Sequence, residues 1–346
     1  MKSSLYGLKN TNRNFDLKES WGKNQFNSSF PASLCCYFYK KKLRANYIII
    51  EDEKTLISEI KIEELLGAKP EDLFFSFESI FENYSNYVNG SLPRNDLVLK
   101  NLKTKKSIRS LEIKLTAIPD ETTFDEDEEN YGSEIVVRPD TIVYLVCSII
   151  KNFKMSKEEI DSLKKMKTLS WTDNNEVLSQ FPKILEIINT ISISNKFNND
   201  PLILQPIWKT KGKSPTLDDN CLDIFVWSSA SFLNFITKIS KAANYKNINR
   251  PMRTVIWVFK MLLDYIIEGK FDFKKIFDKL SYSTRNDKAF ASSGKITNKF
   301  MYCKNLIKPR IKKNEIKDII LNNGHEMLSP ERRFDAVIFN DKNLFQ

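Results

Sequence analysis

Three ionisable residues on a predicted β-hairpin have the types and spacing of a catalytic group. Asp96 begins the first strand, and Glu112 and Lys114 lie two residues apart on the second strand, within "RSLEIKLTAIPD" (109–120). Side chains two residues apart on a strand point to the same face, so Glu112 and Lys114 would share a face while apolar residues fill the other. A tight antiparallel hairpin would bring Asp96 beside Glu112.

Two neighbouring carboxylates could bind a metal ion at this hairpin. They repel each other unless a cation joins them, and Mg²⁺ binds through one or two carboxylates while keeping several waters. Lys114 could then hold the attacking water and neutralise the charge that develops during hydrolysis. The alternative is a solvated strand face whose ion pair contributes little to stability. One strand alone does not decide between the two.

A third carboxylate could come from the segment that precedes the hairpin. Apolar residues recur at helical spacing in "EDLFFSFESIFENYSNYV" (71–88), which predicts an amphipathic helix with Glu78 and Glu82 four residues apart. Glu78 is the preferred third ligand, but a solvent-facing helix acid explains either residue equally well.

The elements predicted around the hairpin follow the order helix, three strands, helix. The hairpin strands are 96–102 and 108–118, and "SEIVV" (133–137) is the third strand. The next segment, "RPDTIVYLVCSIIKNF" (138–153), predicts a helix with Pro139 in its first turn. This order matches an α/β protein with a mixed sheet flanked by helices.

Further elements are predicted on both sides of this group. Ser156 and Glu159 fit a capping box that begins another helix. Pro182 is expected to kink the helix predicted at 175–191. The same reasoning predicts a helix at 32–42 and strands at 45–50, 202–210 and 221–228, the last two joined by a basic loop at 211–220.

The charge of the chain favours a polyanionic partner. The formal net charge is +10 and the isoelectric point is near 9.1, which suggests nucleic acid first and an anionic membrane surface second. Residues 238–313 hold 19 Lys and Arg against 5 Asp and Glu. The run "DETTFDEDEE" (120–129) is acidic and without apolar period, which predicts a solvated loop. A soluble protein that is simply basic remains the alternative.

Cysteine and histidine content excludes several kinds of site. The five cysteines form no CxxC pair, which favours small core residues in a reducing, cytoplasmic setting. His325 is the single histidine, so a multi-histidine zinc site is excluded and a Ser-His-Asp or Cys-His mechanism would depend wholly on it. No uncharged apolar run reaches the roughly 18–20 residues that span a bilayer, and the N-terminus lacks the apolar core of a signal peptide.

The chain resembles a known family in several local stretches. The acid, spacer and Glu-x-Lys order of Asp96, Glu112 and Lys114 is similar to that of the PD-(D/E)xK nucleases. Four regions together resemble the type II restriction endonucleases of the HindVP kind: "WGKNQFNSSFP" (21–31), "LEIKLTAIPD" (111–120), "LQPIWKTKGKSP" with "CLDIFVWS" (204–228), and "LSPERRFDAVI" (328–338).

The resemblance implies an activity and a fold. It implies a Mg²⁺-dependent endonuclease that hydrolyses phosphodiester bonds of double-stranded DNA at a short palindromic sequence, with Asp96, Glu112 and Lys114 catalytic and the first two binding Mg²⁺. A homodimer would match the palindrome, and a separate cognate DNA methyltransferase would protect the host. The fold expected is a PD-(D/E)xK nuclease-like core with an additional, mostly helical C-terminal part.

Two features qualify this expectation. Asn95 stands before Asp96 where the name of the nuclease class would place proline, and the Pro-Asp pairs at 119–120 and 139–140 follow the Glu-x-Lys. No clean linker divides the chain, and the best division is an N-terminal arm and first helix at 1–40, a nuclease core at 41–230, and a basic, mostly helical DNA-binding part at 231–346.

Several polar residues are candidates for contact with DNA. Asn and Ser side chains can reach base edges or phosphates, and lysines and arginines can reach phosphates. Helix capping, solvated turns and an ion pair explain the same residues without DNA. The lysines of the predicted hairpin tip would lie beside the catalytic group. The candidates are Lys23, Asn24, Asn27, Ser28, Lys103, Lys105, Lys209, Lys211, Lys213, Arg332 and Arg333.

Two other functions fit the same sequence. A non-catalytic, basic DNA-binding regulator would bind DNA in a salt-dependent way without cutting it. A PD-(D/E)xK repair nuclease would cut without producing discrete fragments. The chain shows no methyltransferase tetrad, so modification of DNA would fall to another protein.

Overall fold

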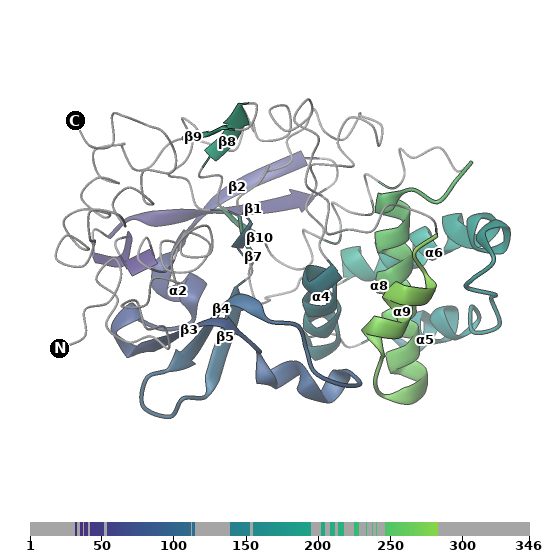
Figure 1. Cartoon of the computed structure of the whole chain (residues 1–346), viewed down its shortest axis with the longest axis horizontal. Helices are drawn as coiled ribbons and strands as arrows, with labels where there is room; N and C mark the ends of the chain where they lie inside the picture. Colours follow the sequence, from purple (N-terminus) through teal and green to yellow (C-terminus); the bar gives the residue numbers. More distant parts are fainter. Residues whose placement is uncertain are drawn as a thin grey trace.

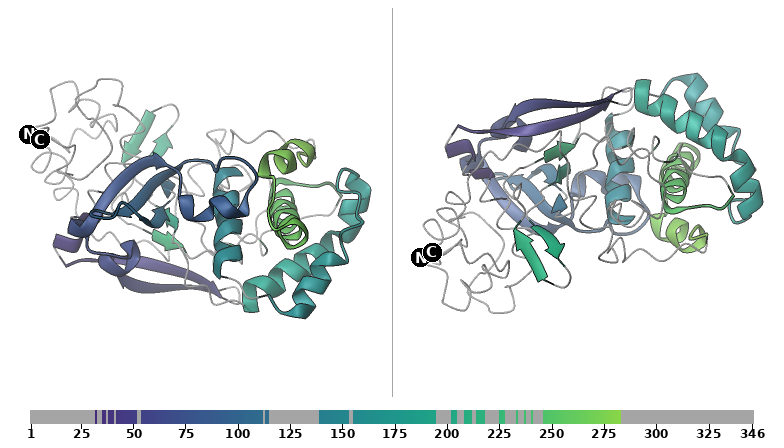
Figure 2. Two further views of the ribbon diagram at one scale, coloured as in Figure 1. Left: turned by 90° about the horizontal axis from the view of Figure 1, so that it is seen from below. Right: turned by 90° about the horizontal axis from the view of Figure 1, so that it is seen from above.

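The computed structural model describes most of residues 32–282, and the account below concerns those residues. In Figures 1 and 2 the strands gather on one side of the molecule and most helices on the other, with α4 standing between them. The gaps are 33–34, 37, 41, 52–53, 112, 115–138, 153–154, 195–201, 205–207, 212–213, 218–224, 228–232, 234–236, 238–239 and 241–245.

A three-stranded antiparallel sheet forms the first layer of strands. The order is β3-β4-β5, with the connection of β4 and β5 formed by the short turn at 102–106. The antiparallel hairpin predicted between the strands at 96–102 and 108–118 is therefore confirmed. The strands are β3 (Leu73–Ser79), β4 (Asn95–Asn101) and β5 (Ser107–Leu111).

A mixed five-stranded sheet has the order β2-β1-β10-β7-β6. The β1 strand pairs antiparallel with β2 and parallel with β10, and β7 pairs antiparallel with β10 and parallel with β6. Together with the helices, this sheet confirms an α/β protein. The strands are β1 (Arg44–Glu51), β2 (Lys54–Lys61), β6 (Ile113–Lys114), β7 (Leu202–Leu204) and β10 (Phe225–Trp227).

The successive strands β5 and β6 belong to different sheets. Leu111 ends β5 and pairs with Leu97 in the three-stranded sheet, whereas Ile113 begins β6 and pairs with Ile203 in the five-stranded sheet. The predicted strand at 108–118 is thus shared by two sheets as far as it is described. The predicted third strand at 133–137 lies outside the described residues.

The helix predicted at 71–88 is wrong. This segment forms the 3₁₀ turn η3 (Pro70–Asp72), the strand β3, and the 3₁₀ helix η4 (Glu82–Tyr87). Leu73, Phe75 and Phe77 are buried at every second position, and each pairs with a residue of β4. Aromatic side chains pack well on a pleated surface, so cross-strand pairing prevails over the helical spacing of the aromatic residues.

The helices predicted in the middle of the chain are confirmed. Pro139 is the first residue of α4, and Ser156 and Glu159 form the expected capping box, with Glu159 N donating to Ser156 Oγ at 3.2 Å. The kink expected at Pro182, inside α6, stays a prediction. The helices are α2 (Ile62–Leu66), α4 (Pro139–Asn152), α5 (Lys157–Lys164), α6 (Asn174–Ser194), α8 (Arg250–Glu268) and α9 (Phe273–Lys279). Ala32, Cys35, Cys36 and 38–40 are also helical, as expected for 32–42.

A continuous apolar core joins the helices to the three-stranded sheet. The α8 helix packs against α4, α5, α6 and α9, and its buried residues belong to the same cluster as Phe81, Tyr84 and Val98. The α2 helix lies against β5, where Arg109 Nη1 donates to Leu65 O at 3.0 Å. The division of the chain into three parts at 40 and 230 stays a prediction.

The basic loop predicted at 211–220 is partly wrong. The structure forms an antiparallel hairpin from β8 (Trp208–Lys211) and β9 (Ser214–Leu217), in which Lys211 pairs with Ser214. The ladder continues with Thr210 paired to Pro215 and Lys209 paired to Thr216. Threonine is β-branched, and β-branched residues favour strands. No described helix has the length and apolar content needed to cross a membrane.

Candidate active site

The position of Asp96 is fixed by strand pairing on both sides of β4. Asp96 is half-buried and precedes Leu97, which pairs with Phe77 of β3 and with Leu111 of β5. Asp96 therefore lies near the end of β4 that is farthest from the hairpin turn. Glu112 itself lies outside the described residues; along the chain it is the neighbour of Leu111.

Glu78 lies beside Asp96 on the neighbouring strand. The pairs Phe77 with Leu97 and Ser79 with Asn95 enclose these two acids from both directions. Partners in an antiparallel ladder have Cα atoms about 5 Å apart, so the backbones of Glu78 and Asp96 belong to one small area of the sheet. The expectation that Glu78 extends from a helix is wrong, and its role as a third carboxylate stays a prediction.

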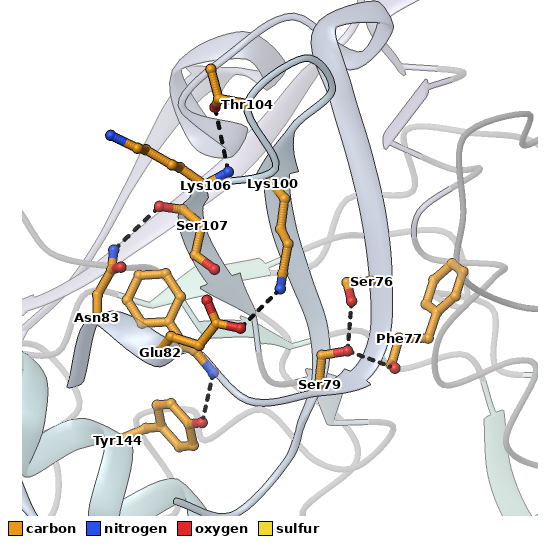
Figure 3. A network of polar contacts seen from close by, with 11 residues as sticks. Ser76, Phe77, Ser79, Glu82, Asn83, Lys100, Thr104, Lys106, Ser107 and Tyr144 are labelled. Atoms are coloured by element: carbon orange, nitrogen blue, oxygen red, sulfur yellow. Dashed lines mark hydrogen bonds and ion pairs between the residues drawn. The ribbon is translucent and has the colours of Figure 1, made fainter. Parts of the chain in front are cut away.

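The backbone at Glu78 departs from a regular strand. Its φ is +46°, in the left-handed region, which costs a residue with a Cβ roughly 1–3 kcal/mol. This left-handed backbone reverses the alternation of side chains after Glu78. Residues three apart in a strand normally face opposite sides, but Ser79 Oγ lies 2.6 Å from Ser76 Oγ. Ser79 Oγ also donates to Phe77 O at 3.0 Å, as Figure 3 shows.

Glu82 is engaged elsewhere and does not share this position. Its Oε1 accepts from Lys100 Nζ at 3.3 Å, and Asn83 Nδ2 donates to Ser107 O at 3.2 Å (Figure 3). These two contacts hold η4 against the hairpin formed by β4 and β5. Of the two acids considered as a third ligand, the geometry therefore favours Glu78.

Lys114 is placed by the second sheet. Its backbone pairs with Leu204 in β7, and Ile113 pairs with Ile203. The residues that enclose Glu112 are thus each held by a different sheet, Leu111 by β4 and Ile113 by β7. The side chains of Glu112 and Lys114 lie outside the described part of the structure.

No complete metal site is present within the described residues. No group of three or more His, Cys, Asp or Glu side chains gathers there. Two described acids at neighbouring strand positions, Glu78 and Asp96, carry the hard oxygen atoms that Mg²⁺ prefers, and Mg²⁺ needs only one or two carboxylates from a protein. The donor atoms therefore fit such an ion.

The turn between β4 and β5 presents exposed lysines, but at the far end of β4. Lys103, Lys105 and Lys106 are all exposed. Asn101 Oδ1 fixes the turn by accepting from Lys103 N at 3.0 Å and from Thr104 N at 2.9 Å. A strand rises about 3.4 Å per residue, so the turn lies about 17 Å from Asp96 along the strand. The expectation that these lysines lie beside the catalytic group is wrong.

Of the other DNA-contact candidates, the structure describes Lys209 and Lys211. Lys209 and Lys211 lie on β8 rather than in a loop, and their pairing partners are Thr216 and Ser214. The remaining candidates lie outside the described residues, as does His325: Lys23, Asn24, Asn27, Ser28, Lys213, Arg332 and Arg333.

The described cysteines are structural. Cys35 and Cys147 are buried and all three described cysteines are free of disulfides. Burial raises the pKa of the Cys147 and Cys35 thiols, and burial also raises the pKa of Cys36 to about 12. A thiol with a raised pKa is not a ready nucleophile. The interpretation as small core residues is confirmed for Cys35 and Cys147, whereas Cys36 is half-buried.

The comparison with known proteins decides the family. The profile described as HindVP restriction endonuclease matches residues 21–345. The chain belongs to the HindVP restriction endonuclease family. Members named as type II restriction enzymes are site-specific endonucleases, so this HindVP-family protein is an enzyme of that kind, as the local resemblances indicated.

Two relatives of this HindVP-family chain match along nearly their whole length. The probable type II restriction enzyme HindVP of Haemophilus influenzae is 46% identical over 350 residues, covering 100% of this chain and 96% of that protein. The type II restriction enzyme HgiDI of Herpetosiphon aurantiacus is 40% identical over 347 residues, covering 99% and 97%. No solved structure matches the chain significantly.

The sequence prediction missed the strand that carries Glu78 and the polar contacts that fix its end. The alternation of Leu73, Phe75 and Phe77 was a signal for the strand, because each is apolar at period two. No local signal indicated that Tyr144, on α4, contacts the same area, since 63 residues separate it from Phe81.

Proposed function

We propose that this protein hydrolyses phosphodiester bonds of double-stranded DNA at a short palindromic sequence in a reaction that requires Mg²⁺. Family membership carries the proposal, because the match extends over residues 21–345 and both relatives are named type II restriction enzymes. The net charge of +10 suits a polyanionic substrate.

The acids around the end of β4 are the proposed metal ligands. Asp96 and Glu112 would hold Mg²⁺, with Glu78 as the third carboxylate. Support comes from the pairs that enclose Glu78 and Asp96 and from the pairing of Leu97 with Leu111, each of which neighbours one of the two proposed ligands. When bound, Mg²⁺ would polarise the scissile phosphate and lower the pKa of a coordinated water.

Lys114 is the proposed partner of the attacking water. Its backbone is fixed in β6 by the pairing with Leu204, two residues beyond Glu112. Its ammonium group would donate a hydrogen bond to the water oxygen and offset the negative charge that develops on the phosphate oxygens. The lysine thereby orients the water and stabilises the transition state electrostatically, without forming a covalent bond to DNA.

A palindromic substrate implies a symmetric enzyme. A two-fold dimer places one site at each strand of a duplex with the same symmetry, so we propose a homodimer. A cognate DNA methyltransferase would act on the same sequence as a separate protein.

The exposed lysines of the β4–β5 turn are proposed phosphate contacts. Lys103, Lys105 and Lys106 project from a turn that Asn101 fixes, about 17 Å along the strand from Asp96. Because the duplex carries phosphates along its whole length, lysines at that distance can bind phosphates away from the scissile bond. Lys209, Lys211 and the candidates outside the described residues stay proposed contacts of the same kind.

Digestion of a sequenced genome tests the function directly. Purified protein is incubated with DNA in Mg²⁺ and in EDTA, and the ends of the fragments are mapped. We expect discrete fragments with a common palindrome at their ends in Mg²⁺ and intact DNA in EDTA. Salt-dependent binding without cutting would favour the regulator, and cutting at unrelated positions would favour the repair nuclease.

Site variants test the residues. Glu112→Ala and Lys114→Ala should each abolish cutting of a plasmid that carries the mapped site. Glu82→Ala is the matched control, because it also removes an acid near the hairpin but one whose exposed carboxylate pairs with Lys100, an interaction of about 0–1 kcal/mol. Unimpaired cutting by either site variant would refute the assignment.

A further inference from the structure

Tyr144 joins two chain segments beside the proposed site. Its hydroxyl accepts from Phe81 N at 3.2 Å and donates to Pro93 O at 2.8 Å. Phe81 follows β3, which carries Glu78, and Pro93 precedes β4, which carries Asp96. One buried hydroxyl therefore contacts the exit of one acid-bearing strand and the entry of the next, and Figure 3 shows its contact with the backbone at Phe81.

The hydroxyl takes the place of further strand pairing. The last pair of the β3–β4 ladder is Ser79 with Asn95, and Phe81 and Pro93 each lie two residues beyond it. Proline has no N–H, so Pro93 cannot complete an ordinary ladder pair with Phe81. The buried N–H of Phe81 needs an acceptor, and the Tyr144 hydroxyl supplies it while donating to the Pro93 carbonyl.

Tyr144 is itself held by a rigid surrounding. It lies on α4, which packs against α8 through the apolar core. Its ring contacts that of Tyr84, with ring centroids 5.9 Å apart, and Tyr84 contacts Phe81 edge-on at 4.8 Å. The phenol thus has a defined position from which it can fix the two strand ends.

We propose that Tyr144 is a positioning residue, whose hydroxyl sets the distance between the strand ends that carry Glu78 and Asp96 and so the geometry of the metal ligands. This inference rests on the proposed function of the site. Groups that orient metal ligands change metal affinity or activity by about 10–100-fold when they are removed.

Tyr144→Phe removes the hydroxyl and keeps the ring. We expect the Mg²⁺ concentration for half-maximal cleavage of plasmid carrying the mapped site to rise by about 10-fold. DNA binding without metal should stay unchanged, because the change affects the ligands of the ion and no contact to DNA.

Tyr282→Phe is the matched control for loss of stability. The Tyr282 hydroxyl is also largely buried and donates to Trp171 O at 2.6 Å, in the helical part of the molecule. Tyr282→Phe should lower the melting temperature as Tyr144→Phe does, without changing the Mg²⁺ concentration for half-maximal cleavage. An equal Mg²⁺ dependence in the two variants would overturn the inference.

Amide exchange in the wild-type protein gives a second measurement that needs no variant. Coupling between two sites is reciprocal, so saturating Mg²⁺ should slow hydrogen exchange at the Phe81 amide. The Gly269 amide, which donates to Tyr265 O at the end of α8, is the internal control. Unchanged exchange at Phe81 would overturn the inference even if Tyr144→Phe did not fold.

Asp96→Asn, measured in parallel, separates this inference from the proposed function. Cleavage by Asp96→Asn at the wild-type rate would overturn the site and the inference together. Loss of cleavage in Asp96→Asn, combined with a Tyr144→Phe enzyme that responds to Mg²⁺ like Tyr282→Phe, would leave the site in place and overturn the role of Tyr144 alone.

Discussion

The strand region (73–111) and the helical region (α4, α5, α6, α8 and α9) are stabilised in different ways. In the helical region, helix ends are satisfied by residues close in sequence: Asn249 Oδ1 accepts from Met252 N at 3.0 Å, and Asp272 Oδ1 accepts from Lys275 N at 3.1 Å. Such caps contribute about 1 kcal/mol each, and α8 also buries a long apolar face.

In the strand region two hydrogen bonds join residues that are far apart in sequence. Arg109 reaches Leu65, 44 residues away, and the hydroxyl of Tyr144 reaches Pro93, 51 residues away. The same region holds Glu78 with its positive φ. Strained and polar features of this kind cluster at functional sites, so changes here should affect cleavage more than stability, and changes in the helical region the reverse.

The strongest test of this difference is Asp96→Asn in the strand region. Removing the charge of a metal ligand should lower single-turnover cleavage by more than about 10³-fold, equal to about 4 kcal/mol of barrier. The free energy of unfolding, measured with urea, should change by less than about 1 kcal/mol, because no large core contact is removed. A large loss of stability with cleavage retained per folded molecule would contradict the contrast between the regions.

Leu262→Ala in the helical region should have the opposite effect. Leu262 is fully buried on α8, and truncating a buried leucine destabilises by about 2–5 kcal/mol. We expect the urea midpoint to fall while cleavage per folded molecule stays at the wild-type rate. Leu262→Met keeps the volume and should cost less than about 1.5 kcal/mol. A cleavage defect in the folded fraction of Leu262→Ala would show that the two regions are coupled more tightly than we infer.

Two sets of exposed lysines extend the comparison to DNA binding. Replacing Lys103, Lys105 and Lys106 with Ala should weaken binding and reduce the slope of log affinity against log salt by about 0.9 for each phosphate that is no longer neutralised. The control replaces three exposed lysines of the helical region that have no proposed role in DNA binding: Lys164, Lys165 and Lys167. The slopes are measured by fluorescence anisotropy. Equal salt slopes for the two triple variants would show that the β4–β5 turn does not contact DNA.

The difference between local contacts at helix ends and long-range contacts in the strand region explains which elements the sequence could predict. Pro139 and the pair Ser156 and Glu159 are local signals, because a helix start is specified by residues within one turn. The segment 71–88 carries aromatic residues compatible with both a period of 3.6 and a period of two. Pairing with β4 selects the strand, and sequence periodicity alone does not reveal that pairing.

The arrangement of the candidate site was predictable only where it depended on one hairpin. Asp96 could be assigned to a strand start from its place before a short run of apolar residues, and the β4–β5 turn was short enough to indicate antiparallel pairing. The proximity of Glu78 to Asp96 required the β3 strand, and the contact of Tyr144 with both strand ends required the packing of α4. Neither follows from residue spacing, because both depend on tertiary contacts.

Ser156→Ala has the smallest expected effect, and it tests whether a local helix-capping contact influences cleavage. The Ser156 side chain accepts from Glu159 N, and Glu159 Oε2 accepts from Ser156 N at 2.8 Å, so the variant loses half of the capping box. It should destabilise the protein by about 1 kcal/mol, whereas Ser156→Asp, which also caps, should restore most of that. Urea denaturation measures both variants, and cleavage should match wild type in each. A cleavage defect would mean that α5, which packs on α8, influences the strand region through the shared core.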